Sequence, residues 1–370
     1  MMCLAGCRAG RKSRWRRPGL SLFLAAAAIA APLAARATEA LDFFRIGTAA
    51  TTGTYFQIGG VLASAISKPP GARDCERGGS CGVPGLVAVA QASQGSLQNA
   101  LALGAGQLES ALIQSDVAYW AYADAMVAPK RCRQASGEPA RPPPPKSQGP
   151  IKNLRVIAGL FPEDVHVVVR ADSPIRSLRD LKGRPVALGE PESGTLADAR
   201  LVLEAAGLSE CEVKAQYLRL SEAADALVEG RIDAFFVVAG YPVPAVVDVA
   251  TATPTRLLPI PPETAERLAQ KFPFFGRDVI PAGSYPGLDT ETPTLSTTAL
   301  WATRAEIDAD LVYAITKSLW SDATRRLLEA THPAGRRIRL ATALDGLTIP
   351  LHPGAARYYR EVGMKIPDGL

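Results

Sequence analysis

Histidine is scarce in this sequence, and so are the patterns of common catalytic sites. The 370 residues include only three histidines, His166, His332 and His352, which lie far apart without metal-ligand spacing. We expect structural roles for all three and no metal site. No serine stands in a Gly-x-Ser-x-Gly turn, and no nucleophile is paired with a base. The sequence therefore does not predict an enzyme.

Motifs for nucleotides are missing as well. The turn from Gly47 to Thr54 lacks the lysine of a phosphate-binding loop, and no Gly-x-Gly-x-x-Gly follows a predicted strand. The net charge of +5 does not indicate a nucleic-acid partner either, because residues 1–37 carry seven basic side chains and no acidic one. Without these seven, 34 basic residues stand against 36 acidic ones. We expect no cofactor and no nucleic-acid partner.

The first 37 residues have the three parts of an export signal. They are a basic start, an apolar run from Leu20 to Ala31, and small residues at 35–37 before a cleavage point. A membrane anchor is the alternative, but a spanning helix needs about 20 apolar residues, and Pro32 interrupts this run. We expect a signal peptide at 1–37 and a periplasmic location. The pair Arg16-Arg17 leaves open whether export follows the general or the twin-arginine route.

Four cysteines follow this leader: Cys75, Cys81, Cys132 and Cys211. An oxidising compartment favours disulfides over metal or catalytic thiols. Cys75 and Cys81 flank a short glycine-containing loop that a disulfide could close locally. For Cys132 and Cys211, a second disulfide and two free thiols both remain open.

Strand-like and helix-like patterns alternate along the chain. The helix-like segments are 58–66, 97–103, 196–206 and 221–230, and the strand-like segments are 43–47, 108–114, 165–170, 185–189 and 232–238. This alternation predicts the α/β class, with parallel strands covered by helices. Ser96 and the pair Ser115-Asp116 are predicted helix caps, and the proline-rich stretch 139–150 predicts an extended surface loop.

Small polar residues follow four of these strands, where open α/β sheets bind ligands. Unpaired N–H groups at the helix starts favour an anion such as a carboxylate. We expect the binding residues in the turns 48–55, 114–116, 192–195 and 239–241. The candidates are Thr48, Thr51, Thr52, Gly53, Thr54, Tyr55, Gln114, Ser115, Asp116, Ser193, Gly194, Thr195, Gly240 and Tyr241.

At these turns the sequence resembles the TAXI family, the extracytoplasmic solute-binding proteins of tripartite ATP-independent periplasmic (TRAP) transporters. Four blocks carry the resemblance in order along the chain: residues 46–60, residues 114–119, residues 178–183 with 193–195, and residues 221–236.

The resemblance implies a type II periplasmic binding fold with a ligand cleft between two lobes. Residues 41–164 with 293–370 would form the first lobe and residues 165–292 the second. It implies capture of a small anionic solute, such as glutamate, a related amino acid or a dicarboxylate, for delivery to TRAP permease subunits. A ligand-binding module of a periplasmic sensing system is the alternative. We expect a monomer.

Overall fold

The structure is a computed structural model that describes residues 42–125 and 149–370. The expected signal peptide, Cys132 and most of the proline-rich stretch lie outside the described residues. The strands are β1 (Asp42–Gly47), β2 (Ser67–Lys68), β3 (Val83–Pro84), β4 (Leu86–Gln91), β5 (Ser110–Gln114), β6 (Leu154–Arg170), β7 (Pro185–Ala187), β8 (Lys214–Gln216), β9 (Ala234–Ala239), β10 (Thr255–Leu257), β11 (Gly276–Ile280) and β12 (Thr292–Arg304). The α-helices are α1 (Thr54–Ile66), α2 (Ser96–Gly104), α3 (Ser115–Ala123), α4 (Gly194–Ala205), α5 (Leu220–Val228), α6 (Pro244–Ala252), α7 (Pro262–Lys271), α8 (Ala309–Leu319), α9 (Asp322–Thr331) and α10 (Pro353–Glu361). Within the described ranges, none of these helices is both long and apolar enough to span a bilayer.

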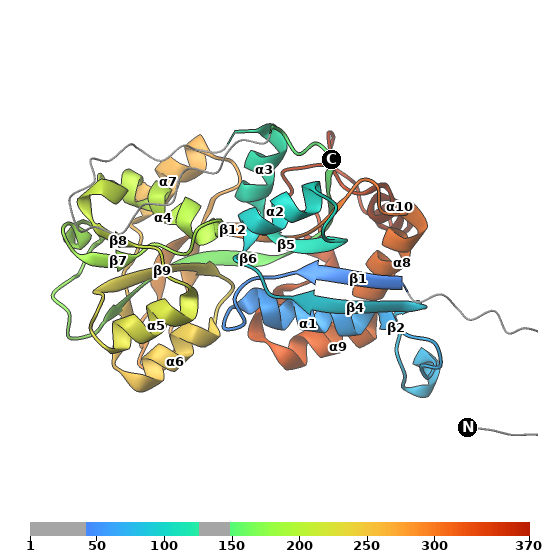
Figure 1. The fold of residues 1–370 in the computed structure, drawn as a ribbon, viewed down its shortest axis with the longest axis horizontal. Helices are drawn as coiled ribbons and strands as arrows, with labels where there is room; N and C mark the ends of the chain where they lie inside the picture. Colours follow the sequence, from blue (N-terminus) through green and yellow to red (C-terminus); the bar gives the residue numbers. More distant parts are fainter. Residues whose placement is uncertain (1–41, 126–148) are drawn as a thin grey trace, which may run out of the picture. The chain divides into compact units, whose positions relative to one another are not determined.

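One large mixed sheet organises the chain. Its main path runs β4-β1-β5-β12-β6-β9-β7-β8, with β10 beside β6 and β11 beside β12. Strands β4, β1 and β5 are parallel and are followed by antiparallel β12. Strands β8, β7 and β9 repeat this order and are followed by antiparallel β6. Helices lie on both faces of the sheet (Figure 1). This arrangement confirms the predicted α/β class, and its repeated strand order is that of the two-lobed type II fold.

Two long strands connect the two repeats. The 17-residue β6 pairs with β12 up to Asp164 and with β9 from Asp164 onward. Ser296 in β12 lies opposite Asp164, so both strands change partners near one residue pair. The expected lobe boundary at 164 and 165 falls beside this pair. We call residues 42–164 with 293–370 the first half and residues 165–292 the second half; their division into lobes stays a prediction.

Apolar patterning explains the central strands and helices. Every residue of β5 and β9 is buried, because strands within a parallel sheet are covered on both faces. In α1, the buried residues Ile58, Leu62 and Ile66 recur every four positions and face the core. Helix α4 ends before Gly207, whose φ of +81° suits the residue after a helix.

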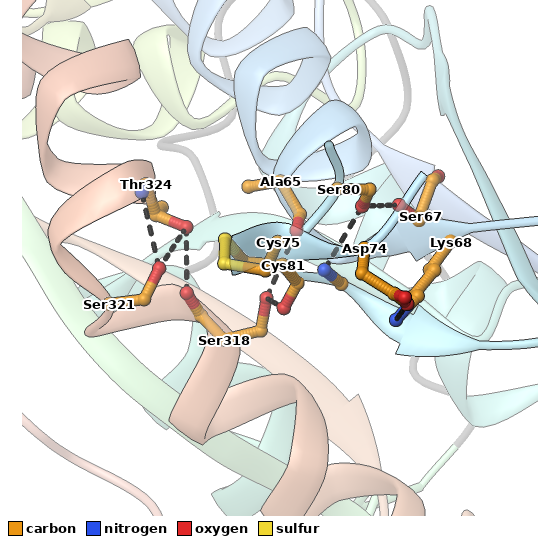
Figure 2. Close-up of a disulfide and its surroundings, with 11 residues drawn as sticks. Ala65, Ser67, Lys68, Asp74, Cys75, Ser80, Cys81, Ser318, Ser321 and Thr324 are labelled. Atoms are coloured by element: carbon orange, nitrogen blue, oxygen red, sulfur yellow. Dashed lines mark hydrogen bonds and ion pairs between the residues drawn. A yellow bond between two sulfur atoms is a disulfide. The ribbon is translucent and has the colours of Figure 1, made fainter. Parts of the chain in front are cut away.

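The loop between β2 and β3 is closed by a disulfide between Cys75 and Cys81. Figure 2 shows this loop beside α8, where Ser318 Oγ donates to the carbonyl of Cys81 at 3.3 Å and to that of Ala65 at 3.0 Å. Lys68 Nζ contacts Asp74 Oδ1 at 3.2 Å across the loop. Cys211 is disulfide-bonded too.

Replacing both Cys75 and Cys81 by serine is expected to lower the free energy of unfolding by about 2 kcal/mol, because the cross-link restricts the unfolded chain. Urea unfolding of the variant and the wild type measures this difference. Solute affinity should stay unchanged, since neither cysteine lines the pocket described below. A tenfold loss of affinity would contradict a purely structural role for this loop.

Candidate functional site

A pocket lies where strands of both halves end. Its cavity volume is about 80 Å³, so a solute enclosed there would be small. Half of the expected binding residues line it: Gly53, Thr54, Tyr55, Gln114, Ser193, Gly194 and Thr195. The turns after β1, β5 and β7 therefore meet at one place.

The other expected residues do not line the pocket, because their groups are engaged elsewhere or face away. The Thr48 hydroxyl donates to the carbonyl of Gln91 at 2.8 Å, and Thr51 is exposed. The guanidinium carbon of Arg337 lies 5.0 Å from the centre of the Tyr241 ring. The residues outside the wall are Thr48, Thr51, Thr52, Ser115, Asp116, Gly240 and Tyr241. The structure therefore gives no support for their direct contact with a solute.

Hydrogen bonds join the two halves around the pocket. The buried Thr54 hydroxyl in the first half donates to the carbonyl of Gly240 in the second at 2.7 Å. On another side, the N–H groups of Leu97 and Gln98 donate to the carbonyl of Glu192 at 3.1 and 3.2 Å. These bonds form only while the halves touch, so the structure represents a closed arrangement.

Gln114 also connects the halves through its side-chain amide. Its Nε2 donates to Asp198 Oδ2 in α4 at 2.9 Å. Its Oε1 accepts from Ser96 Oγ at 3.2 Å. Gly194 lies so close that a β-carbon there would be 1.3 Å from Gln114 Oε1. The absence of a side chain at residue 194 thus allows α4 to approach β5.

Two expected helix caps are wrong. Helix α2 begins at Ser96 itself, with Gly95 as its N-cap. The Ser96 side chain points to Gln114 instead of capping its own helix. Helix α3 begins at Ser115 with Gln114 as its N-cap, and the Ser115 hydroxyl lies 2.9 Å from Thr297 Oγ1. In both cases a tertiary hydrogen bond takes the hydroxyl that the sequence pattern assigned to a cap.

A buried carboxyl group, Glu163 of β6, lines the pocket. It is 1% exposed, and the Tyr55 hydroxyl donates to its Oε2 at 2.6 Å. Burial raises the pKa of Glu163 well above its ordinary value, and the hydrogen bond from Tyr55 opposes this rise. Burial, followed by the charge of Glu163, also raises the pKa of the Tyr55 phenol. In the empty pocket, Glu163 therefore tends to retain its proton.

A second acidic pair lies behind the wall and bridges the halves. Asp116 belongs to α3 and Asp198 to α4, and both are fully buried. The negative charge of Asp116 acts on the carboxyl group of Asp198, which favours a proton on one of the two. Burial raises the pKa of Asp116 to about 6, and burial followed by the charge of Asp116 raises that of Asp198 well above its ordinary value.

The described residues contain no group of three or more histidine, cysteine, aspartate or glutamate side chains placed to hold a metal ion.

Cationic side chains are missing from the pocket wall as far as the described residues form it. Exposed Arg219 lies at the mouth, where its charge partly offsets the raised pKa of about 7 that burial gives Glu190. Arg170 and Arg200 are engaged elsewhere, in ion pairs with Asp172 at 2.8 Å and with Glu210 at 2.9 Å. The expected anionic solute thus lacks a charged partner in this wall.

The sequence reasoning missed Ser96, Glu163, Glu190 and Asp198. A signal for Glu163 was present, since two acidic residues interrupt the otherwise apolar run of β6. Charges in a buried strand are costly unless they are neutralised or serve a function. Asp198 gave a weaker signal, because one aspartate on a helix is usually solvated.

Comparison with known proteins identifies the family. The model of the NMT1-like family matches residues 46–132 and 144–363. The chain belongs to the NMT1-like family. The family match includes the segments of both halves that line the pocket.

Solved structures resemble this NMT1-like chain more distantly. The aliphatic sulphonate binding protein SsuA from Escherichia coli has 17% identity and a TM-score of 0.41, covering 79% of this chain and 80% of its own. The ligand binding component of an ABC-type import system from Staphylococcus aureus has 11% identity and a TM-score of 0.44, covering 87% and 89%. Similarity this low does not determine the ligand or the transporter of this NMT1-like protein.

Proposed function

We propose that this chain is the extracytoplasmic solute-binding protein of a TRAP transporter of the TAXI type. It would capture a small solute in the pocket and deliver it to the permease subunits. The observation that carries the proposal is a pocket walled by both halves, with direct hydrogen bonds between them at its edge. The export signal and the four sequence blocks support the same function.

The pocket geometry suggests how capture would work. Residues from the turn after β1 and from α1, β5 and α2 line one side, and residues from the turn before α4 and from β9 line the other. A solute that touches both sides stabilises the closed arrangement, because it binds that arrangement better than the open one. The permease would then recognise the closed surface. This proposal treats the halves as the two lobes expected from the sequence.

The first test is a thermal-shift screen of the exported protein, purified from the periplasm. The panel contains amino acids, amines, monocarboxylates, dicarboxylates and neutral polyols. A solute at 100 times its dissociation constant is expected to stabilise the protein by about 2.7 kcal/mol, which raises the melting temperature by several degrees. If no compound in the panel changes the melting temperature, the proposed function is wrong.

The second test separates the transporter types. Membrane vesicles that contain the TRAP subunits encoded with this protein are prepared without ATP, and a cation gradient is imposed across their membrane. Uptake of the solute found in the screen should require both this protein and the gradient. Uptake that needs ATP hydrolysis instead would reject the TRAP assignment and keep the solute-binding role. Binding without uptake by either system, combined with a response in a sensor kinase, would favour the sensing alternative.

A further inference from the structure

The charges around the pocket point to the chemical class of the solute, if the proposed function holds. Among the described residues, the wall contains two carboxyl groups, Glu163 and Glu190, and no lysine, arginine or histidine. Asp116 and Asp198 add two more carboxyl groups directly behind it. A solute anion would be buried beside these groups with no cation to offset its charge, which is strongly unfavourable.

Glu163 presents an acceptor to the pocket. Tyr55 donates to Oε2, whereas Oε1 receives no hydrogen bond from the described residues. The side chain is fixed by this bond and by its place in β6, next to the residue at which β6 changes partners. When Glu163 is ionised, its second carboxyl oxygen can accept a hydrogen bond from a solute in the pocket that it lines. This oxygen is therefore a preorganised site for a hydrogen-bond donor, best a charged one.

The apolar residues of the wall limit the chemical group that carries the hydrogen-bond donor of the solute. Leu218 and Leu220, at the start of α5, are half-buried apolar side chains that line the same pocket. Ala49 and Ala50 add small apolar surface on the opposite half. Gln114 uses both ends of its amide on Asp198 and Ser96 and is not free to neutralise a second charge.

We propose that the pocket binds a solute with a primary ammonium group, which donates to Glu163 while a short apolar chain packs against Leu218 and Leu220. A zwitterionic amino acid and a simple alkylamine both satisfy this description. A dicarboxylate without an amine does not. The proposal thus adds a required ammonium group to the anionic solute expected from helix N-termini, because carboxyl groups outnumber cations at this wall.

Proton movement gives an independent signature. Glu163 tends to keep its proton while the pocket is empty, and an ammonium group favours its ionised form. Tyr55, Asp116 and Asp164 are the other titratable groups that act on Glu163. Binding of an amine at neutral pH is therefore expected to release a proton from the protein. The released proton is measured by calorimetry in two buffers of different ionisation enthalpy.

The test compares matched probes by calorimetry on the wild-type exported protein. One set is leucine, 3-methylbutylamine and 4-methylpentanoate; the other is glutamate, 4-aminobutyrate and glutarate. We expect an amine-bearing member to bind at least about tenfold more tightly than the member without an amine, because a hydrogen bond to a charged group contributes about 1.5–3 kcal/mol. Equal or tighter binding of 4-methylpentanoate or glutarate would overturn the proposal and leave the solute-binding function standing.

Two variants locate the ammonium site. Glu163→Gln should weaken amine binding at least about tenfold and abolish proton release, while binding of the amine-free member changes less than threefold. Glu109→Gln is the control, because this carboxyl group pairs with Arg45 at 2.7 Å and does not line the pocket. Melting curves show whether each variant is folded. Unchanged amine affinity in folded Glu163→Gln would overturn the assignment. If no probe of any charge binds the wild type, the proposed function itself fails.

Discussion

Replacement of Gly194 by alanine is expected to weaken solute binding at least about fivefold. The new β-carbon would be 1.3 Å from Gln114 Oε1, so Gln114 must leave its position. Moving it breaks the hydrogen bonds to Asp198 and Ser96, and each bond between neutral groups contributes about 0.5–1.5 kcal/mol. Calorimetry with the best solute of the screen measures the loss.

The empty protein should tolerate the same change. Gly194 and Gln114 meet across the two halves, so opening removes the clash. Gly60→Ala provides a matched control, because Gly60 also lies in a helix and a β-carbon there meets nothing within 4 Å. This control should bind normally and be slightly more stable, as alanine favours a helix. Normal affinity in Gly194→Ala would contradict the closed arrangement as the binding-competent one.

The stability of the empty protein is expected to fall as the pH rises from 7 to 8.5. The pKa values of Asp198 and Glu163 are raised by burial, so the folded state holds protons that the unfolded state has already lost. The protonated form of such a group stabilises the folded state. This contribution is fully present below the unfolded pKa of about 4, and it is lost as the pH rises through the folded pKa. We expect the melting temperature to drop by at least about 2 °C over this window. Scanning calorimetry at each pH measures it.

The window avoids the histidines, whereas Glu190, whose pKa burial raises to about 7, still titrates at its lower end. Burial lowers the pKa of His166 to about 4 and also lowers those of His332 and His352. Their contribution to stability is lost below their unfolded pKa of about 6.5, so they remain neutral above pH 7. Asp116, with a pKa of about 6, has mostly lost its proton by then.

Amide variants show which carboxyl groups cause the fall of the melting temperature with pH. Asp198→Asn keeps an acceptor for Gln114 and supplies an N–H donor to Asp116, so it imitates the protonated acid. Combined with Glu163→Gln, it should flatten the pH dependence. In Glu109→Gln the slope should persist, because pairing with Arg45 lowers the pKa of Glu109 and places its titration far below this window. A slope that survives in the double variant would show that other groups are responsible.

The periodicity of apolar residues was sufficient to predict the α/β class, four helices and five strands, which are fewer than half of the described ones. It placed the turns around Gly53 and Gly194 correctly in one pocket, because both follow strands of a parallel sheet. It could not predict the charge of the pocket. Glu163 becomes a wall residue only through the exchange of partners at Asp164, and Asp198 reaches Gln114 only through packing of α4 on the other half. Both facts depend on contacts between segments far apart in sequence.

The position of β12 has a consequence for how the chain matures. This strand lies between β5 and β6, yet it is synthesised only after some 290 earlier residues. Until then β5 has an uncovered edge, and exposed edges recruit other strands. On the proposed export route, a chain arriving N-terminus first would therefore need protection from self-association until its last quarter emerges, which would make periplasmic chaperones relevant to its yield.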